Sequence, residues 1–279
     1  MIDQLRNLSE DEVVVPRELA RPAVTLLDEL GKGAFGVVYK GLMREGGGIP
    51  DYLVAVKSLH ATSSASDRSE LLEEAAVMAQ FRHENVVQLV GVVTVGKPVL
   101  VVLEFLEYGA LKSYVEKNDL PEVTKVLFAG DIAAGLRHVI SKGFVHRDVA
   151  ARNVLVSSTK RCKIADFGMA RESECEDEGG AAYYRSRGGQ LPVRWSSPEA
   201  LDERKFTEKS DVWSFGVTLH ELWNRAQIPY GDWHNQRVWV EISAGHRLAQ
   251  PLDCDDETYA MMLRCWLVDP SARPTFEEL

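Results

Sequence analysis

The feature that most constrains the fold is a change of hydrophobic pattern near Tyr108 and Gly109. Before it, residues 25–103 contain short runs of β-branched and aliphatic residues, separated by glycine or polar turns. These strand candidates are residues 27–30, 37–39, 53–56, 86–93 and 99–103. Residues 67–81 interrupt them, because there the apolar side chains recur at helical spacing. The pattern predicts a small β-rich lobe that carries one helix.

After this point the apolar spacing is helical. Residues 121–142 have proline in the first turn and a stripe at positions 123, 126, 127, 132, 136, 139 and 140, which we expect to face the core. Residues 212–222 form a second stripe, with Ser210 and Asp211 as start signals. Residues 239–242 and 259–267 predict two more helices, and residues 276–279 read as a helix that is cut short.

The predicted class is α+β, with a small sheet lobe and a larger, mainly helical lobe. We expect a leader or juxtamembrane-like segment at 1–24, the small lobe at 25–106 and the large lobe at 107–279. Residues 104–108 would form the hinge. A cleft between two lobes is the default place for a ligand.

Composition narrows the class of protein further. The 279 residues are 45% hydrophobic and 27% charged, which is typical of a globular chain. A formal net charge of -10 argues against a broad nucleic-acid-binding surface. The four cysteines form no CxxC pair, which favours free thiols in a reducing compartment over a disulfide framework. The sequence has neither an apolar run of roughly 18 residues nor a signal peptide, so any membrane attachment would come from segments outside it.

The loop at 146–153, His-Arg-Asp-Val-Ala-Ala-Arg-Asn, concentrates chemistry. Asp148 could lie beside a substrate hydroxyl, while the amide oxygen of Asn153 could face a metal ion. Asp166, in Asp-Phe-Gly, offers a second carboxylate for the same metal. This combination predicts phosphoryl transfer assisted by a metal ion.

A glycine-rich stretch lies between two strand candidates: Gly31, Gly33 and Gly36 follow the G-x-G-x-x-G spacing. Such glycines let the backbone close over phosphates and present N–H groups to them. A dinucleotide-binding turn is the main rival, and it requires a helix directly after the glycines. Residues 37–39 instead continue as a strand, which favours a flap over a nucleotide; an ordinary glycine-rich hairpin remains open.

Lys57 ends an apolar strand, where an unpaired ammonium group would be costly. Glu74, on the inward stripe of the following helix, is a plausible partner. A lysine held in this way could contact the α- and β-phosphates of a nucleotide. The alternative is that Lys57 only extends to solvent at the sheet edge.

Together these motifs resemble the protein-kinase family over residues 25–279. Six motifs occur in order, including Ser-Pro-Glu at 197–199 and Asp-Val-Trp-Ser-Phe-Gly at 211–216. The resemblance implies ATP and Mg²⁺ as cofactors, with Mn²⁺ as an alternative metal. It also implies that Asp148 accepts the substrate proton, that Asn153 and Asp166 hold the metal, and that Lys57 paired with Glu74 fixes the phosphates.

The resemblance further implies a set of nucleotide contacts, with Leu103 as the gatekeeper that narrows the pocket behind the adenine. These ATP-binding positions are Leu30, Gly31, Gly33, Gly36, Val38, Ala55, Lys57, Leu103, Glu104, Leu106 and Leu155. Structural positions implied by the same resemblance are the spine residues Met78, Leu89, His146 and Phe167, the anchor Asp211, and a buried ion pair of Glu199 with Arg273.

Two segments resemble the tyrosine-kinase branch of the family. Serine/threonine kinases usually carry lysine two residues after the catalytic Asp, whereas this chain has Ala150 there and a basic group at Arg152. A tyrosyl hydroxyl lies farther from its backbone than a seryl one, so the basic group approaches from another point. Pro192, Val193, Arg194 and Trp195 resemble the segment that supports the substrate, followed by Ser196-Ser197 where most relatives have Met-Ala.

Tyr183 and Tyr184, followed by Arg185 and two glycines, resemble the activation loops of insulin-receptor-like and Eph-like kinases. The resemblance implies that a second copy of the chain phosphorylates both tyrosines, and that Arg147, Arg171 or Arg185 then pairs with the phosphates. The acidic run at 172–178 reads as a solvated face.

We therefore expect a cytoplasmic protein tyrosine kinase domain that acts on tyrosines of protein substrates. Its parent is either a plasma-membrane receptor or a non-receptor protein, and the Arg152 pattern and the paired tyrosines favour the receptor. Two alternatives stay open. One is a signalling scaffold of the pseudokinase type, which the presence of Lys57, Glu74, Asp148, Asn153 and Asp166 disfavours. The other is a dual-specificity kinase, which Arg152 and the segment 192–195 disfavour.

Overall fold

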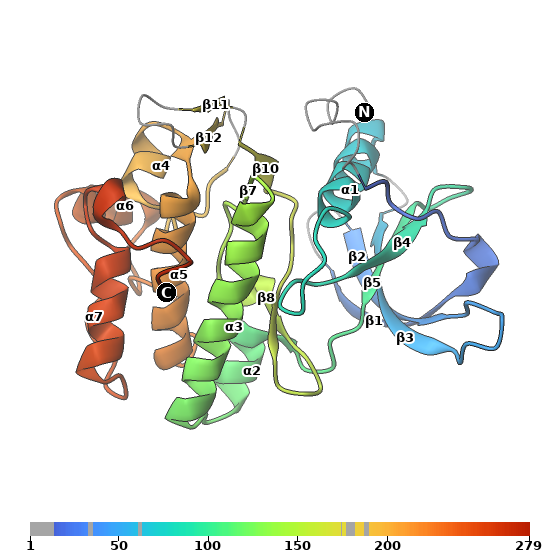
Figure 1. The fold of residues 1–279 in the computed structure, drawn as a ribbon, viewed down its shortest axis with the longest axis horizontal. Coiled ribbons are helices and arrows are strands. Elements are labelled where there is room, and N and C mark those ends of the chain that lie inside the picture. Colours follow the sequence, from blue (N-terminus) through green and yellow to red (C-terminus); the bar gives the residue numbers. More distant parts are fainter. Residues whose placement is uncertain (1–13, 33–35, 61–62, 174, 177–181, 187–189) are drawn as a thin grey trace. The chain divides into compact units, whose positions relative to one another are not determined.

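The computed structural model describes residues 14–32, 36–60, 63–173, 175–176, 182–186 and 190–279 (Figure 1). The chain divides into two compact units, one up to Glu107 and one from Tyr108 onward. Each unit is described by itself below.

The first unit is built on a five-stranded antiparallel sheet in the order β1-β2-β3-β5-β4. All five predicted strands are present. Their bounds are β1 (Val24–Lys32), β2 (Gly36–Met43), β3 (Tyr52–Leu59), β4 (Leu89–Val93) and β5 (Leu100–Glu104). The fourth is shorter than predicted: Val86 and Val87 are buried but precede the strand, so their apolar character reflects a buried loop.

The two faces of this sheet differ in role. Val54 and Val56 are fully buried and pack with Met43 and Val102 on one face. Because side chains alternate along a strand, Ala55 and Lys57 lie on the other face. There the helix α1 (Ala65–Met78) packs through Leu71 and Ala75 against residues of β4 and β5. The sheet therefore has a closed face and a face that remains partly open.

Helix α1 begins at Ala65, before the predicted start at 67, because a polar cap at Ser64 fixes its N-terminus. The Ser64 side chain accepts from the Asp67 N–H, and the Asp67 side chain accepts from the Ser64 N–H, which is a capping box. The helix ends at Met78, also before the predicted 81.

Residues before β1 pack on the same sheet. Glu18 forms a parallel bridge with Val92, and the Leu19 N–H donates to the Val92 carbonyl at 2.7 Å. A Cβ atom at Gly91 would lie 2.5 Å from the Arg17 carbonyl oxygen, so only glycine allows this approach. Leu19 is buried and belongs to the closed-face core. Residues 1–13 of the predicted leader lie outside the described residues.

The second unit is mainly helical. Its helices are α2 (Leu111–Lys117), α3 (Glu122–Ser141), α4 (Pro198–Asp202), α5 (Glu208–Trp223), α6 (Asn235–Ser243) and α7 (Asp256–Cys265). Its short strands form three small sheets: β6 (Gly109–Ala110) with β8 (Val154–Val156) and β9 (Cys162–Ile164); β7 (Phe144–Val145) with β10 (Arg171–Glu172); and β11 (Cys175–Glu176), β12 (Ala182–Arg185) and β13 (Lys205–Phe206). The short helices α2 and α4 were not predicted.

Helix α5 is the central element of this unit and packs against α3 and α7 (Figure 1). Every residue of α5 from Ser210 to Trp223 is buried. The helix begins at Glu208, before the predicted start signals, because Thr207 caps it and exchanges a reciprocal hydrogen bond pair with Ser210. A helix buried on all sides must satisfy its polar side chains internally, which turns them into structural contacts.

The predicted core stripe of α3 is only partly correct. Val123, Val126 and Leu127 are exposed, whereas Ile132 and Leu136 are fully buried as expected. At about 100° per residue, Val123 lies on the opposite side of the helix from Ile132. The prediction therefore merged two faces of one helix.

Three further expectations concern the last residues of the sequence, membrane-spanning helices and the cysteines. Residues 276–278 form a turn rather than the start of a helix, and the Glu278 carboxylate accepts from the Thr275 N–H. Among the described helices, none has both the length and the apolar content required to cross a bilayer. The cysteines at 162, 254 and 265 are buried free thiols, as predicted.

Candidate active site

Asp148 is held by two residues of the turn that follows it. The Asn153 side-chain N–H donates to Asp148 Oδ2 at 2.7 Å and to the Asp148 carbonyl at 2.8 Å. The Arg152 guanidinium donates to Asp148 Oδ1. A single 3-10 turn, Ala151–Asn153, brings both side chains back over the carboxylate. The structure thus unites three of the predicted residues, with both carboxylate oxygens occupied and the side chain 16% exposed.

The start of the same loop is attached to α5. Asp211 accepts from the backbone N–H groups of His146 and Arg147 at 2.7 and 2.9 Å. Burial raises the pKa of Asp211, and the two N–H groups oppose that shift. His146 contacts the Ala165 carbonyl through Nε2 at 3.1 Å, and its ring lies 5.0 Å from that of Phe167. These contacts fit the packing role expected for His146.

Two more polar residues of α5 contact this region: Ser214, from the motif at 211–216, and Glu221, which the sequence did not point to. Glu221, which is 2% exposed, accepts from the Ala151 N–H at 2.9 Å and from the Trp195 indole N–H at 2.8 Å. Ser214 donates to the Trp195 carbonyl at 2.7 Å. The sequence signal for Glu221 was an acidic residue within the stretch 212–222 that carries the apolar stripe. Sequence alone could not name its partners.

The two predicted metal ligands flank the open end of one hairpin, Asn153 before its first strand and Asp166 after its second. Strands β8 and β9 pair with Val154 opposite Ile164, and the Ala165 N–H donates to the Asn153 carbonyl at 2.8 Å. Asp166, directly after Ala165, is exposed and has φ of 57°. Because the Asn153 NH₂ group donates to Asp148, its amide oxygen is the end left for a cation.

This oxygen donor set suits Mg²⁺. Among the described residues there is no cluster of three His, Cys, Asp or Glu side chains that could hold a metal. Mg²⁺ does not require one, because it commonly uses one or two protein ligands together with substrate phosphates and waters. Asn153 and Asp166 therefore fit the predicted metal, and the oxygen ligands suit Mn²⁺ as well.

In the first unit, Lys57 is paired with Glu74 rather than extended to solvent. Its Nζ lies 2.5 Å from Glu74 Oε2, and the side chains are 26% and 9% exposed. Strand register places Val38 opposite Lys57 and Leu103 opposite Ala55. Directly opposed residues point to the same face of an antiparallel sheet. Four predicted nucleotide contacts thus share the partly open face.

The glycine-rich stretch lies at the junction of β1 and β2. Gly31 lies in β1 and pairs with Val38, and Gly33 lies outside the described residues. Gly36 has a packing role, since a Cβ atom there would lie 2.1 Å from the Ser58 carbonyl oxygen. The residues after it form a strand, which rules out the dinucleotide-binding turn.

The remaining predicted ATP contacts differ in their exposure to solvent. Leu30 is exposed, Leu106 is buried, and Leu155 is half-buried on β8 of the second unit. The Glu104 N–H donates to the Gln88 carbonyl at 3.0 Å. A contribution from Glu104 to adenine binding would therefore use its carbonyl oxygen.

The substrate-segment candidates are fixed from within. The Trp195 N–H and the Ser196 hydroxyl both donate to the Pro192 carbonyl, at 2.9 and 3.1 Å. The Arg152 guanidinium carbon lies 4.3 Å from the centre of the Trp195 ring, a cation–π contact. Val193 is half-buried within this turn.

Arg194 behaves differently from its neighbours. Its guanidinium donates to the carbonyls of Pro229 at 2.5 Å, Gly231 at 3.0 Å and Trp233. The charged group anchors the segment to the loop that follows α5. Any support that it lends to a substrate is therefore indirect.

The two loop tyrosines lie in the small sheet of β11, β12 and β13. Tyr184 pairs with Phe206, and the Arg147 guanidinium carbon lies 4.7 Å from the Tyr184 ring and 4.3 Å from the Phe206 ring. Lys205 Nζ lies 4.8 Å from the Tyr183 ring. Both tyrosines are half-buried. Of the acidic run 172–178, residues 174, 177 and 178 lie outside the described residues.

Arg147 carries an incompletely satisfied charge. Its Nε is buried without a hydrogen-bond partner among the described residues. Burial lowers the pKa of Arg147 to about 10, and the charges of Arg171 and Arg204 act in the same direction. An additional anion near this cluster would stabilise it electrostatically.

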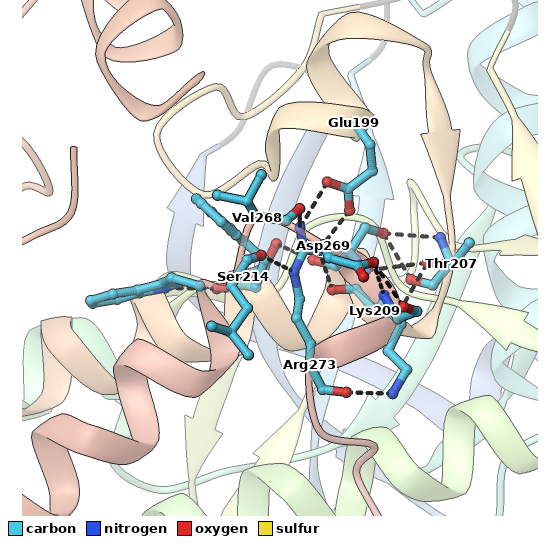
Figure 2. Close-up of polar contacts among 12 residues, drawn as sticks. Glu199, Thr207, Lys209, Ser214, Val268, Asp269 and Arg273 are labelled. Atoms are coloured by element: carbon cyan, nitrogen blue, oxygen red, sulfur yellow. Dashed lines mark hydrogen bonds and ion pairs between the residues drawn. The ribbon is translucent and has the colours of Figure 1, made fainter. Parts of the chain in front are cut away.

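The predicted ion pair of Glu199 and Arg273 is present in the second unit (Figure 2). Arg273 donates to the two Glu199 oxygens at 2.6 and 2.9 Å, and its side chain is fully buried. It also donates to the Lys209 carbonyl, while the Lys209 ammonium donates to the Arg273 carbonyl at 2.7 Å. The pair connects the start of α4 and the start of α5 to the C-terminal segment.

Comparison with known proteins agrees with this geometry. The family model "Protein tyrosine and serine/threonine kinase" matches residues 24–279. The chain therefore belongs to this family, and its α+β bilobal fold class is confirmed. As a member of this family it is a protein-kinase domain, and thus an ATP-dependent transferase, as predicted.

Its relatives include three receptors. The chain is 42% identical to Ephrin type-A receptor 7 of Gallus gallus over 94% of its length, covering 26% of that protein. It is 41% identical to Ephrin type-B receptor 1 of Gallus gallus over 97%, covering 28%. It is 39% identical to Ephrin type-A receptor 5 of Homo sapiens over 94%, covering 25%. The chain spans about a quarter of the length of these relatives.

Proposed function

We propose that the protein transfers the γ-phosphate of ATP to tyrosine hydroxyls of protein substrates, with Asp148 as the proton acceptor. The observation that carries this proposal is the orientation of Asp148 by Arg152 and Asn153 within one turn. A carboxylate held in this way can orient a hydroxyl and accept its proton as the phosphoryl group is transferred.

The cofactor roles are proposed for residues of each unit separately. Asn153 and Asp166 would hold Mg²⁺, or Mn²⁺, whose charge offsets that of the transferring phosphate. Lys57, kept in place by Glu74, would bind the α- and β-phosphates. The face shared by Val38, Ala55 and Leu103 would contact the adenine.

Tyrosine as acceptor is supported by the position of the basic group. Ala150 is fully buried and offers no charge, whereas Arg152 lies against both Asp148 and the Trp195 ring. The cation thus contacts both the proposed base and the proposed substrate segment.

The decisive experiment compares Asp148→Asn with the wild type on tyrosine-containing and serine/threonine-containing polymers. We expect kcat to fall by about 10²–10⁴-fold, because the base is lost. The affinity for ATP, measured by titration with a fluorescent analogue, should stay within about twofold, since Asp148 does not bind the nucleotide. Near-normal turnover of the variant would refute the assignment of the base.

The same assay separates the alternatives. Phosphotyrosine alone supports the proposal. Phosphorylation of both polymers by the wild type would indicate a dual-specificity kinase. Nucleotide binding without turnover on either polymer would indicate a scaffold.

We further propose that a second copy of the chain phosphorylates Tyr183 and Tyr184. Each phosphate adds about -1.5 to -2 charges. At Tyr184 these charges would lie beside Arg147, whose guanidinium already contacts the tyrosine ring. The half-buried rings must leave the β12 sheet to be modified, so phosphorylation would reorganise the loop.

The double variant Tyr183→Phe/Tyr184→Phe should lose the activation that the wild type gains during preincubation with ATP. Tyr184→Phe alone should remove the larger part. The initial rate of phosphate incorporation should rise with the square of enzyme concentration if the reaction is between copies. Full activation of the double variant would contradict the proposal.

For the whole protein, we propose a plasma-membrane receptor whose cytoplasmic domain is this kinase, with tyrosine-containing proteins as substrates. The identity to three receptors supports it. Membrane fractionation of the full-length protein, with protease protection of the kinase domain in sealed vesicles, tests both parts. Recovery of the intact protein in the soluble fraction would contradict the receptor assignment.

A further inference from the structure

One face of α5 carries three buried polar residues. Asp211, Ser214 and Glu221 are 1%, 6% and 2% exposed. At about 100° per residue they fall within roughly 80° of each other around the helix. Each forms a hydrogen bond to a segment outside α5. This face therefore acts as a common support for several loops.

The supported segments are the catalytic loop and the substrate segment. Asp211 binds the start of the catalytic loop through two N–H groups, and Glu221 binds Ala151 within it. Trp195 is held twice, by its carbonyl to Ser214 and by its indole to Glu221. The catalytic loop and the substrate segment are far apart in the sequence, so the distance between them depends on the residues that contact both.

Glu221 joins them through a single atom. Its Oε2 accepts both the Ala151 N–H and the Trp195 indole N–H. The Trp195 ring then supports the guanidinium of Arg152, which contacts Asp148. Glu221 is thus connected to Asp148 by two routes. One runs through the loop backbone at Ala151, and the other runs through the Trp195 ring and Arg152.

We propose that Glu221 is a positioning residue that sets the distance between Asp148 and the bound acceptor tyrosine. This inference rests on the proposed function. Loss of the Glu221–Trp195 bond would let the substrate segment and Arg152 shift relative to the base. Displacements of about 1 Å in such a geometry can lower rates by about 10²-fold.

The first test is Trp195→Phe, which keeps an aromatic face for Arg152 but removes the N–H that Glu221 accepts. We expect the KM for a tyrosine peptide to rise and kcat to fall, with kcat/KM about tenfold lower or more. The KM for ATP should stay within about twofold, because neither residue belongs to the proposed nucleotide contacts.

A matched control exists on the same helix. Trp223, also on α5, donates its indole N–H to both oxygens of Glu122 at 2.9 and 3.1 Å. Trp223→Phe removes a bond of the same kind without involving the catalytic loop or the substrate segment. Its kinetic constants for peptide and ATP should equal those of the wild type.

A second pair of variants addresses the carboxylate itself. Glu221→Leu removes the acceptor, whereas Glu221→Gln keeps one oxygen in a side chain of the same shape. We expect Glu221→Gln to restore most of the peptide kcat/KM lost in Glu221→Leu. If Glu221→Leu does not fold, Trp195→Phe and Glu221→Gln still decide the question.

The outcomes are separable. A wild-type enzyme that forms phosphotyrosine, together with a Trp195→Phe variant whose peptide KM and kcat are unchanged, would overturn the positioning role alone. If Trp195→Phe and Trp223→Phe lose activity equally, and the kinetic constants for ATP and peptide change together, the loss reflects reduced stability. That result would also overturn the positioning role. Absence of phosphotyrosine formation by the wild type would overturn the proposed function instead.

Discussion

The most informative contacts at the scale of single residues surround the Arg152 guanidinium. It donates to Asp148 and stacks on Trp195, so one side chain serves the base and the substrate segment together. A planar guanidinium can do both, because it donates within its plane and stacks through its face. A lysine ammonium cannot stack in this way.

We therefore predict that Arg152→Lys lowers kcat/KM for a tyrosine peptide by about 10-fold or more, although the charge is kept. Steady-state kinetics with varied peptide and with varied ATP would check this. The KM for ATP should not move. A variant with wild-type peptide kinetics would show that charge alone is sufficient at this position.

Glu221 also has a consequence for the dependence of stability on pH. Burial raises the pKa of this carboxyl, while Ala151, Trp195, Arg152 and Lys112 act in the opposite direction. A raised folded-state pKa means that the folded protein keeps the proton where the unfolded chain has lost it. The associated stability is present below about pH 4.3 and decreases as the pH rises through the folded-state pKa.

Accordingly, the free energy of unfolding of Glu221→Gln should rise relative to that of the wild type as the pH increases from about 4.3 to 7. Urea unfolding of both proteins across this pH series would measure the difference. A difference that is constant with pH, or that shifts toward the wild type, would contradict a raised pKa.

Individual elements depend on polar residues at their ends. Helix α1 carries Glu74, the partner of Lys57, and begins with the capping box of Ser64 and Asp67. The cap satisfies N–H groups that the first turn of a helix leaves without partners. The position of Glu74 is thus linked to a cap that lies well away from it in the sequence.

Replacing Ser64 with Ala should lower the free energy of unfolding by about 1 kcal/mol. Ser66→Ala is the control, because Ser66 is exposed on the same first turn and its hydroxyl donates to Glu70 at 3.3 Å. That change should be neutral or slightly stabilising, since alanine favours helix. Chemical denaturation of both variants would measure it; equal effects would argue against the cap.

The whole second unit is braced by the Glu199–Arg273 pair, which joins segments distant in sequence (Figure 2). Both side chains are largely or fully removed from water. A buried pair often contributes little overall, because desolvation opposes the attraction between the charges. Removing one partner is costly, since it leaves an uncompensated buried charge.

Arg273→Met should therefore destabilise the protein by about 3–5 kcal/mol. The double variant Glu199→Leu/Arg273→Met should be less destabilised than Arg273→Met, because no isolated charge remains. Thermal unfolding of the wild type, both single variants and the double variant would give the coupling energy. If the loss of stability in the double variant equals the sum of the losses in the two single variants, this account is contradicted.

Several features of the fold and site could be read from the sequence. The five strands, the principal helices and the pairing of Lys57 with Glu74 followed from local hydrophobic period and from the cost of an unpaired lysine. Asp148 and Asn153 were predicted to act within one short loop, and the resemblance to tyrosine kinases added Arg152; the structure brings the three side chains together. These features depend on residues close in sequence.

Other features were decided only by the tertiary structure. Which face of α3 is buried, and why Val86 and Val87 are buried outside a strand, depends on neighbours that are distant in sequence. The anchoring of Arg194 to the 229–233 loop and the bridge from Glu221 to Ala151 and Trp195 arise in the same way. A buried polar side chain must find a partner, but only the packed chain determines which segment supplies it.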